Sequence, residues 1–292
     1  MSQNDKQQIG RDDRSGHGLG PVDTVISVDE VERQAAELSA ERPSRERLSE
    51  LVGKEPLLTI EGLRAGYGKM VVLHEFDLQV GAGQSLCLIG PNGAGKSTAL
   101  HSIYGFTTIT GGAIKIRGND ITHLSSNQKL KRAGIAYILQ DSSIFPEMTV
   151  EENMLMGGFL MKKPSQAREA AEKVLSKYPS LAERRNQNAG VLSGGERRLL
   201  EISRALIMEP EVLLVDEPSI GLEPRFIDMV FEILDDLQYT EGKTIVMVEQ
   251  NAKKGLEFAD IGYVLVSGQL AMADSGDALL QNPEVGRLFL GG

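Results

Sequence analysis

The N-terminal half of the chain first shows strand-like spacing at Leu57. Between residues 57 and 63, and again between 71 and 80, apolar and polar residues alternate, which is typical of antiparallel strands with one covered face. Residues 85–89 form a nearly continuous apolar run, which indicates a strand buried on both faces. A glycine-rich turn follows, and residues 96–104 are predicted to form a helix.

Further along the chain, short apolar runs alternate with helical stretches. Strands are expected at residues 134–139, 212–215, 244–248, 261–266 and 269–272, before a helical C-terminal segment. A mainly helical insertion is expected between residues 150 and 190. Strands that alternate with helices predict a parallel sheet. We therefore expect an α/β domain over residues 56–292, with a parallel core sheet, an antiparallel β subdomain and a helical subdomain at about 150–195.

Residues 1–55 differ in composition from the rest. Polar residues and glycine dominate as far as Pro21, a composition that buries too little apolar surface to order itself. Between Val28 and Leu38 apolar residues fall at helical spacing, and Pro43 then interrupts the pattern. We predict an extension that is disordered or partly helical. A short amphipathic helix that docks on a partner is one interpretation, and a mostly solvated tail is the one that composition favours.

Composition narrows the class of protein. The chain has 292 residues, of which 41% are hydrophobic, and its net charge is −10. A phosphate backbone needs basic patches, so this charge argues against a nucleic-acid partner. The chain contains neither a signal-peptide pattern nor an apolar run approaching the roughly 20 residues that span a bilayer. The single cysteine, Cys87, lies in an apolar strand, and we expect it to be a core residue.

A phosphate-binding loop is predicted immediately after the apolar strand at residues 85–89. Its sequence is Gly90-Pro91-Asn92-Gly93-Ala94-Gly95-Lys96-Ser97, followed by Thr98. The glycines allow a sharp turn that directs backbone N–H groups at phosphate oxygens, and the helix that follows adds its positive dipole end. Lys96 can then reach the β- and γ-phosphates, while the Ser97 hydroxyl can ligate Mg²⁺.

Two adjacent carboxylates end the strand at residues 212–215. Asp216 and Glu217 point in different directions at a strand end, so they can serve different tasks. We expect Asp216 to hold Mg²⁺, directly or through water. Glu217 is the predicted general base, or at least the group that positions the attacking water.

The segment Leu192-Ser193-Gly194-Gly195-Glu196 precedes this acidic pair. It resembles the signature of ATP-binding cassette (ABC) ATPases, and nearly all of residues 57–292 resemble that family. Within the family, the chain is most similar to the ATPase subunits of branched-chain amino acid importers. The stretches that carry this resemblance are 90–98, 145–153, 192–198, 216–222, 248–251 (Val-Glu-Gln-Asn) and 290–292. It implies a P-loop NTPase fold, ATP with Mg²⁺ as cofactors, and ATP hydrolysis coupled to transport.

The resemblance also assigns roles to single residues. Tyr67 matches the aromatic residue that stacks on adenine, although a tyrosine before glycine is equally typical of a turn. Gln140 matches the glutamine that contacts Mg²⁺ and the attacking water. Ser193, Gly194 and Gly195 match the segment that grips the γ-phosphate of ATP held by an opposite subunit.

Two positions depart from the family pattern. The family's switch histidine should follow the strand at 244–248, but this chain has Gln250 there, and its four histidines, the last of them His123, lie far upstream. Glutamine can hydrogen-bond a γ-phosphate but cannot carry a proton charge, so we expect slower hydrolysis at this chain's own site. The second departure is Glu223, where many relatives have aspartate. Both departures recur in the branched-chain amino acid subfamily.

The resemblance implies several partners at the cytoplasmic face of the membrane. They are membrane permease subunits, a second ABC ATPase subunit in a hetero- or homodimer, and indirectly a solute-binding protein. Phe145, Pro146 and Met148 either contact the permease or pack under the helical insertion, and the sequence leaves both interpretations open. Alternatives for the whole protein are urea or amide import, lipopolysaccharide export, a soluble ABC ATPase, or a non-hydrolysing regulatory subunit.

Overall fold

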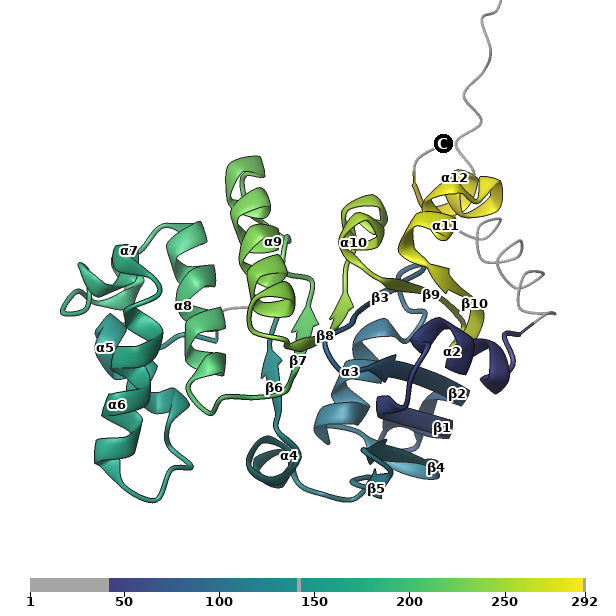
Figure 1. The fold of residues 1–292 in the computed structure, drawn as a ribbon, viewed down its shortest axis with the longest axis horizontal. Helices are drawn as coiled ribbons and strands as arrows, with labels where there is room; N and C mark the ends of the chain where they lie inside the picture. The colour runs from purple at the N-terminus through teal and green to yellow at the C-terminus, as the bar shows by residue number, and fades with distance from the viewer. Residues whose placement is uncertain (1–41, 141–142, 291–292) are drawn as a thin grey trace, which may run out of the picture.

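The computed structural model describes residues 42–140 and 143–290. Two sheets form the framework (Figure 1). The stretch predicted as a docking helix, residues 28–38, lies outside the described residues.

The smaller sheet is antiparallel, with the strand order β2-β1-β4-β5. Its strands are β1 (Pro56–Tyr67), β2 (Met70–Gly81), β4 (Thr108–Ile116) and β5 (Asn119–Asp120). The alternation at residues 57–63 and 71–80 anticipated β1 and β2. Strand β4 was missed because paired glycines at 111 and 112 interrupt its alternation.

The larger sheet has the order β10-β9-β3-β8-β7-β6, and all its neighbouring strands are parallel except β10 and β9. Its strands are β3 (Ser85–Ile89), β6 (Ile135–Ile138), β7 (Val212–Asp216), β8 (Thr244–Val248), β9 (Ile261–Val266) and β10 (Gln269–Ser275). This sheet confirms the predicted parallel core. Its parallel neighbours are far apart in sequence, because parallel strands need a crossover connection.

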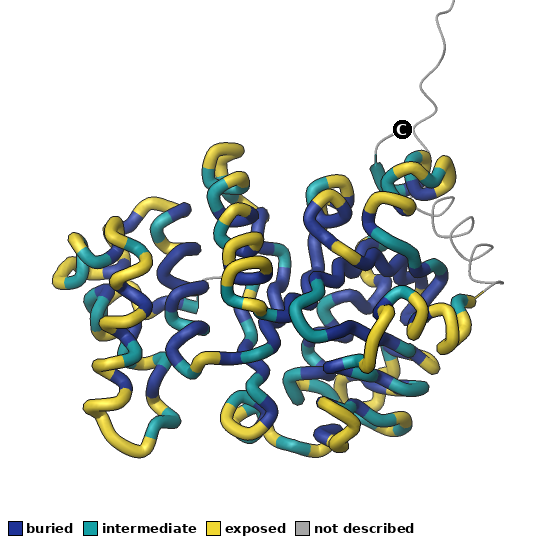
Figure 2. The backbone as a smooth tube through the Cα atoms, viewed as in Figure 1, coloured by how far each residue is buried: buried dark blue, intermediate teal, exposed yellow. Residues whose placement is uncertain are grey.

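Buried apolar residues form two cores, one on each face of the larger sheet (Figure 2). Along β3, Leu86 and Leu88 belong to one core, whereas Cys87 and Ile89 belong to the other. Cys87 is fully buried, as predicted, and burial raises the pKa of its thiol. Successive side chains of a strand point to opposite faces, so both faces of this sheet are covered.

Apart from α2, which is described below, the helices fall into two sets. One set packs around the sheets, and the other forms a group of its own. The helices around the sheets are α3 (Lys96–Tyr104), α4 (Ser126–Ala133), α9 (Pro224–Tyr239), α10 (Ala252–Phe258), α11 (Gly276–Gln281) and α12 (Pro283–Phe289). The group at the left of Figure 1 contains α5 (Val150–Gly157), α6 (Pro164–Leu175), α7 (Pro179–Ala182) and α8 (Gly194–Leu206), with a 3-10 turn at Ala189–Val191. The first three of these helices pack on α8.

Helix α2 (Arg45–Val52) lies inside the predicted N-terminal extension and packs on the domain. Its buried Leu48 and Val52 join the core, against strands β2 and β10. Arg45 pairs with Asp77 at 2.9 Å. The packed part of the chain therefore begins about ten residues before the strand pattern does.

Four functional segments follow parallel strands and meet at one edge of the larger sheet. Gly90 follows β3, Gln140 follows β6, Asp216 ends β7 and Gln250 follows β8. The carboxyl ends of parallel strands share an edge, which is where open α/β sheets bind ligands. The fold thus gathers residues from four distant parts of the sequence.

Candidate functional site

The phosphate-binding loop folds tightly between β3 and α3. Lys96 is 6% exposed, and its Nζ donates to the carbonyl oxygens of Gly90 at 2.8 Å and Pro91 at 3.0 Å. Burial lowers the pKa of Lys96, while the charges of Glu217 and Asp216 oppose that shift. The ammonium is therefore held inside the loop, where phosphate oxygens can replace the carbonyl contacts.

Gly90 is required for this loop because a side chain does not fit there. Its φ is +144°, and a Cβ atom would lie 2.1 Å from the carbonyl oxygen of Leu265 in β9. Gly95, at φ +99°, forms the N-cap of α3. Both positions therefore depend on the absence of a side chain.

Asp216 lies between two hydroxyl groups. Ser97 Oγ donates to its Oδ1 at 3.1 Å, and Tyr137 Oη donates to its Oδ2 at 2.7 Å. Burial, with help from the charge of Asp216, raises the pKa of Tyr137 far above its usual range, so the phenol keeps its proton. Sequence reasoning missed Tyr137. The available signal was a polar hydroxyl in a buried strand three residues before Gln140.

The oxygens of Ser97 and Asp216 suit a hard cation. Mg²⁺ prefers oxygen ligands, and it usually takes one or two protein ligands together with water and substrate phosphates. The described residues contain no cluster of three or more His, Cys, Asp or Glu side chains that could hold a metal ion. The donor set therefore fits Mg²⁺ bound together with a nucleotide.

Gln140 and Glu217 lie in contact at this edge of the sheet. Gln140 Nε2 donates to Glu217 Oε2 at 2.8 Å. Glu217 adopts a φ of +43°, which is uncommon for a residue with a side chain. Its N–H donates to Val248 O at 2.8 Å. An amide and a carboxylate held together beside a phosphate loop can orient a water molecule for attack.

Gln250 is exposed immediately after β8. The preceding Glu249 is buried and accepts hydrogen bonds from Ser219 Oγ at 2.7 Å and from the Asn251 N–H at 2.9 Å. Glu249 thus joins the loop after Glu217 to the loop that carries Gln250. Within the described part of the chain, no hydrogen bond is made by the Gln250 side chain itself.

Tyr67 ends β1 with an exposed ring. Its hydroxyl hydrogen-bonds His101 Nδ1, and the His101 ring packs edge-on against the Tyr137 ring. Burial lowers the pKa of His101. His101 therefore lies beside the site, between Tyr67 and Tyr137. Sequence reasoning had noted only that this histidine lies far upstream of the strand at 244–248.

The signature segment begins α8. Ser193 Oγ accepts from the Glu196 N–H at 3.3 Å, and the Glu196 carboxylate accepts from the Ser193 N–H at 2.8 Å. This reciprocal pair is a capping box. Gly195 packs on Phe226, where a Cβ atom would lie 2.2 Å from the ring. The helix start is therefore fixed, while Ser193 and Gly194 remain exposed.

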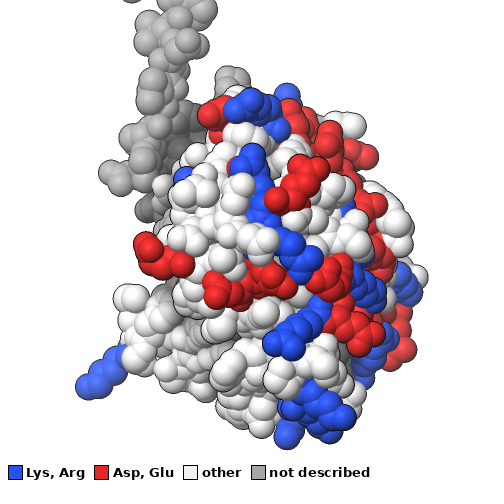
Figure 3. Space-filling model, turned by 90° about the vertical axis from the view of Figure 1, so that its left-hand side faces the viewer, with Lys and Arg blue, Asp and Glu red and all other residues white. Residues whose placement is uncertain are grey.

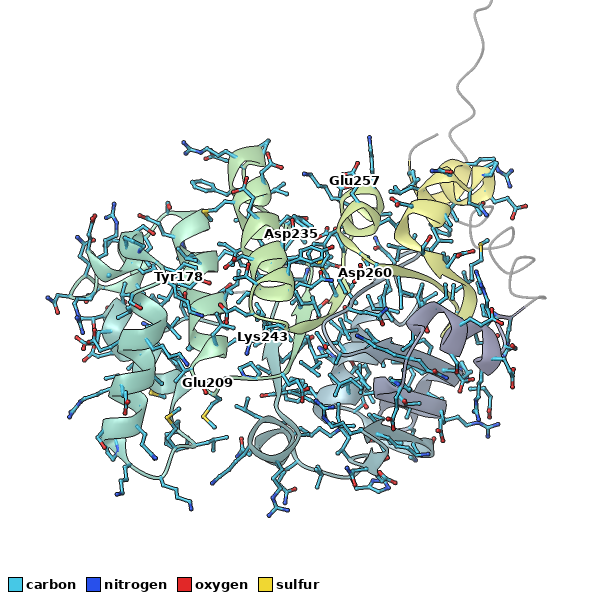
Figure 4. The ribbon with its side chains drawn as sticks, in the orientation of Figure 1. Tyr178, Glu209, Asp235, Lys243, Glu257 and Asp260 are labelled. Atoms are coloured by element: carbon cyan, nitrogen blue, oxygen red, sulfur yellow. The ribbon has the colours of Figure 1, made fainter. Side chains whose placement is uncertain are left out.

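A cleft of about 390 Å³ lies between the signature helix and the catalytic strand ends. Gln140, Glu217 and Gly194 line it, together with Arg198 and Glu201, which sequence reasoning missed. A second hollow, of about 310 Å³, lies beside α6 and is lined by Glu209 and Lys243, both labelled in Figure 4. It contains none of the predicted site residues.

The loop before α5 carries apolar side chains that are exposed or partly exposed. Phe145 and Pro146 are exposed and Met148 is partly so. In the next helix and turn, Met156 is also exposed, and Phe159 is 77% exposed. On the face made by this group of helices, positive and negative side chains are mixed rather than segregated (Figure 3). The apolar residues are thus available for a contact.

Comparisons with known proteins agree with this geometry. The ABC transporter family model matches residues 73–220. The branched-chain amino acid transport ATP-binding protein BraG of Pseudomonas aeruginosa is 42% identical over 81% of this chain and all of its own length. The lipopolysaccharide export ATP-binding protein LptB of Haemophilus influenzae is 32% identical over 80% of this chain and 97% of its own. The ADP-bound structure of MJ1267, an ATP-binding cassette of an ABC transporter, is 28% identical, with a TM-score of 0.72, and the match covers 82% of this chain and all of MJ1267.

Proposed function

The chain belongs to the ABC transporter family, and from that premise we propose that it is the ATP-hydrolysing subunit of an importer for branched-chain amino acids or a related small solute. The observation that carries the hydrolytic part is the 2.8 Å hydrogen bond between Gln140 and Glu217, next to the phosphate loop. The importer assignment rests on the similarity to BraG. The lower identity to LptB makes lipopolysaccharide export the second candidate.

Each site residue has a distinct task in this proposal. Lys96 and backbone N–H groups of the phosphate loop bind the phosphates, and the exposed ring of Tyr67 stacks on adenine. Glu217 accepts a proton from the attacking water, which Gln140 helps to orient. Gln250 donates a hydrogen bond to the γ-phosphate but holds no charge, so it stabilises the transition state less than a protonated histidine would.

Mg²⁺ would be held by Ser97 and Asp216, with Gln140 nearby, and when bound it neutralises charge that develops on the phosphates. Tyr137 keeps Asp216 oriented toward Ser97 by donating to its other carboxylate oxygen. The protein part of the proposed metal site is therefore held together by these two hydrogen bonds.

A second ATPase subunit completes each ATP site in this proposal. Ser193 and Gly194 are exposed at a helix start, where N–H groups and the dipole favour an anion. In Figure 1, α8 lies among the helices at the left, whereas α3 lies between the two sheets and contacts strands of both. The two proposed phosphate-binding elements are therefore separated within one chain. We infer that ATP bridges two chains, and that closure of the pair is favoured because ATP binds the closed state more tightly.

Apolar residues in and beside α5 are the proposed permease contact. They are the exposed Phe145, Pro146, Met156 and Phe159 and the partly exposed Met148. None of the helices in the described part of the chain is long and apolar enough to cross a bilayer. We propose a peripheral subunit at the cytoplasmic face of the membrane, which reaches the solute-binding protein only through the permease.

Transport in membrane vesicles tests the proposal. Vesicles that contain the assembled transporter and enclosed ATP are expected to take up labelled leucine. Glu217→Gln should abolish that uptake while ATP binding persists. Glu257→Gln, on the exposed side of α10, is the matched control and should leave uptake unchanged (Figure 4). ATP hydrolysis without leucine uptake would overturn the proposed solute, whereas the proposed ATPase activity would stand.

The two ATP sites of a mixed dimer are expected to be unequal. Glu217→Gln in this chain and the matching change in the partner should reduce ATP turnover by different factors. Equal losses would refute the asymmetry.

A further inference from the structure

A buried ion pair lies one turn into the signature helix. Arg198 and Glu201 in α8 are 5% and 7% exposed, and Arg198 Nη1 lies 2.9 Å from Glu201 Oε2. Two charges taken out of water cost several kcal/mol each unless hydrogen bonds compensate them. The hydrogen bonds that compensate these two charges therefore show which backbone groups Arg198 and Glu201 hold in place.

Arg198 donates to two main-chain carbonyl groups on neighbouring strands. Nη1 lies 2.7 Å from Leu139 O and Nη2 lies 3.3 Å from Asp216 O. These residues immediately precede Gln140 and Glu217, the two side chains proposed to act on the attacking water. Both terminal nitrogens of the guanidinium thus donate to the protein, whereas the buried Nε has no hydrogen-bond partner among the described residues.

The contact with Asp216 O controls the direction of Glu217. The Asp216 carbonyl and the Glu217 N–H belong to one planar peptide unit. Arg198 holds the carbonyl side, and Val248 O accepts the N–H at 2.8 Å. The uncommon φ of +43° follows directly after this unit. Such a conformation persists only where the surroundings over-determine it, and it costs about 1–3 kcal/mol.

Glu201 binds the backbone of Ser143, three residues after Gln140 in the sequence. Its Oε1 accepts from the Ser143 N–H at 3.0 Å, and Arg204 donates to the carbonyl of the same residue. The position of Gln140 is therefore bounded on one side by Arg198 and on the other by Glu201.

We propose that Arg198 is a positioning residue for ATP hydrolysis, which holds the backbone before Gln140 and Glu217 and links both to the signature helix. The inference rests on the proposed function. Since that helix presents Ser193 to the ATP of the opposite subunit, movement of the signature at one ATP site is transmitted to the hydrolytic pair of the other. Glu201 neutralises the guanidinium and fixes its orientation.

The test removes both charges together. In Arg198→Met/Glu201→Met no unpaired charge is left in the interior, and hydrophobic replacement of a buried ion pair is often neutral for stability. The full-length protein, with the subunits that co-purify with it, is assayed for kcat, for KM, for equilibrium binding of a fluorescent ATP analogue and for melting temperature. Arg197→Met is the matched control, because Arg197 is the exposed neighbour on the same helix.

The double variant is expected to lower kcat about tenfold or more, with affinity for the analogue within about twofold. Arg198→Lys, which can keep part of the contact, should fall between it and the unchanged protein. Arg197→Met should stay within about twofold in kcat. An unchanged kcat in the double variant overturns the proposal, and so does a parallel loss of kcat, nucleotide affinity and melting temperature. Absence of hydrolysis in the unchanged protein would instead overturn the proposed function together with this inference.

Discussion

The two phosphate-binding elements of this chain are built in opposite ways. The phosphate loop closes on itself: Lys96 binds carbonyl groups of its own loop, and Ser97 binds Asp216. In the signature element, Ser193 and Glu196 hydrogen-bond each other, and the start of the helix is exposed. One element is complete within the chain, whereas the other has no phosphate loop of the same chain beside it. The difference fits the proposed dimer, in which a single fold would supply halves of two different ATP sites.

Removal of Lys96 should give the largest difference in ATP affinity between a change in the phosphate loop and a change in the signature. Lys96→Ala deletes the buried ammonium of the phosphate loop, and we expect ATP affinity of the purified chain to fall about a hundredfold, because charge-assisted phosphate contacts are the strong ones. Ser193→Ala should leave that affinity unchanged and lower only turnover. Equilibrium binding of a fluorescent ATP analogue measures both. Equal losses of affinity in the two variants would contradict the division between the elements.

Loss of the Tyr137 hydroxyl should give a smaller effect on the phosphate-loop side. In Tyr137→Phe the Asp216 carboxylate loses one of its two hydroxyl partners. Groups that orient a metal ligand typically change metal affinity or activity by 10- to 100-fold, and we expect about tenfold more Mg²⁺ for half-maximal ATP hydrolysis. A Mg²⁺ titration of ATPase activity measures this. Tyr104→Phe removes a hydroxyl from the same aromatic cluster and is the control. If both variants need the same Mg²⁺ concentration, Tyr137 does not position Asp216.

The signature cap should give the smallest effect, seen in the pH dependence of stability. Hydrogen bonding to Ser193, chiefly to its backbone, lowers the pKa of Glu196 below its usual value of 4.5. The unfolded chain therefore binds this proton more readily, so the stabilisation is fully present above about pH 4.5 and is lost as pH falls through the folded-state pKa. Glu196→Gln should cost about 0.5 kcal/mol at pH 7 and less at pH 4.

Urea unfolding at the two pH values measures that change. Glu147→Gln is the control, because Glu147 is exposed and makes no ion pair within the described part of the chain. A difference between Glu196→Gln and the unchanged protein that stays the same at pH 7 and pH 4 would rule out the charge of Glu196 as its source.

Contiguous motifs could be predicted from the sequence, and the contacts between distant segments could not. The phosphate loop, the acidic strand end and the signature each depend on neighbouring residues, so spacing along the chain determines them. The parallel sheet followed from strands that alternate with helices, whereas the role of Gln140 came only from the resemblance to ABC ATPases. The packing of α2 was not predicted, because Leu48 and Val52 gain a partner only when β2 and β10 come together.

The sequence by itself therefore determined the chemistry of this protein: which groups bind phosphate, which can hold a metal ion, and which end a strand. Only the tertiary structure decided how that chemistry is held in place. Arg198, Leu139 and Asp216 are brought together because β6 and β7 are neighbours and α8 packs beside them. Tyr137 reaches Asp216 for the same reason, across paired strands. Contacts of this kind depend on the order of strands in the sheet, which local spacing does not encode.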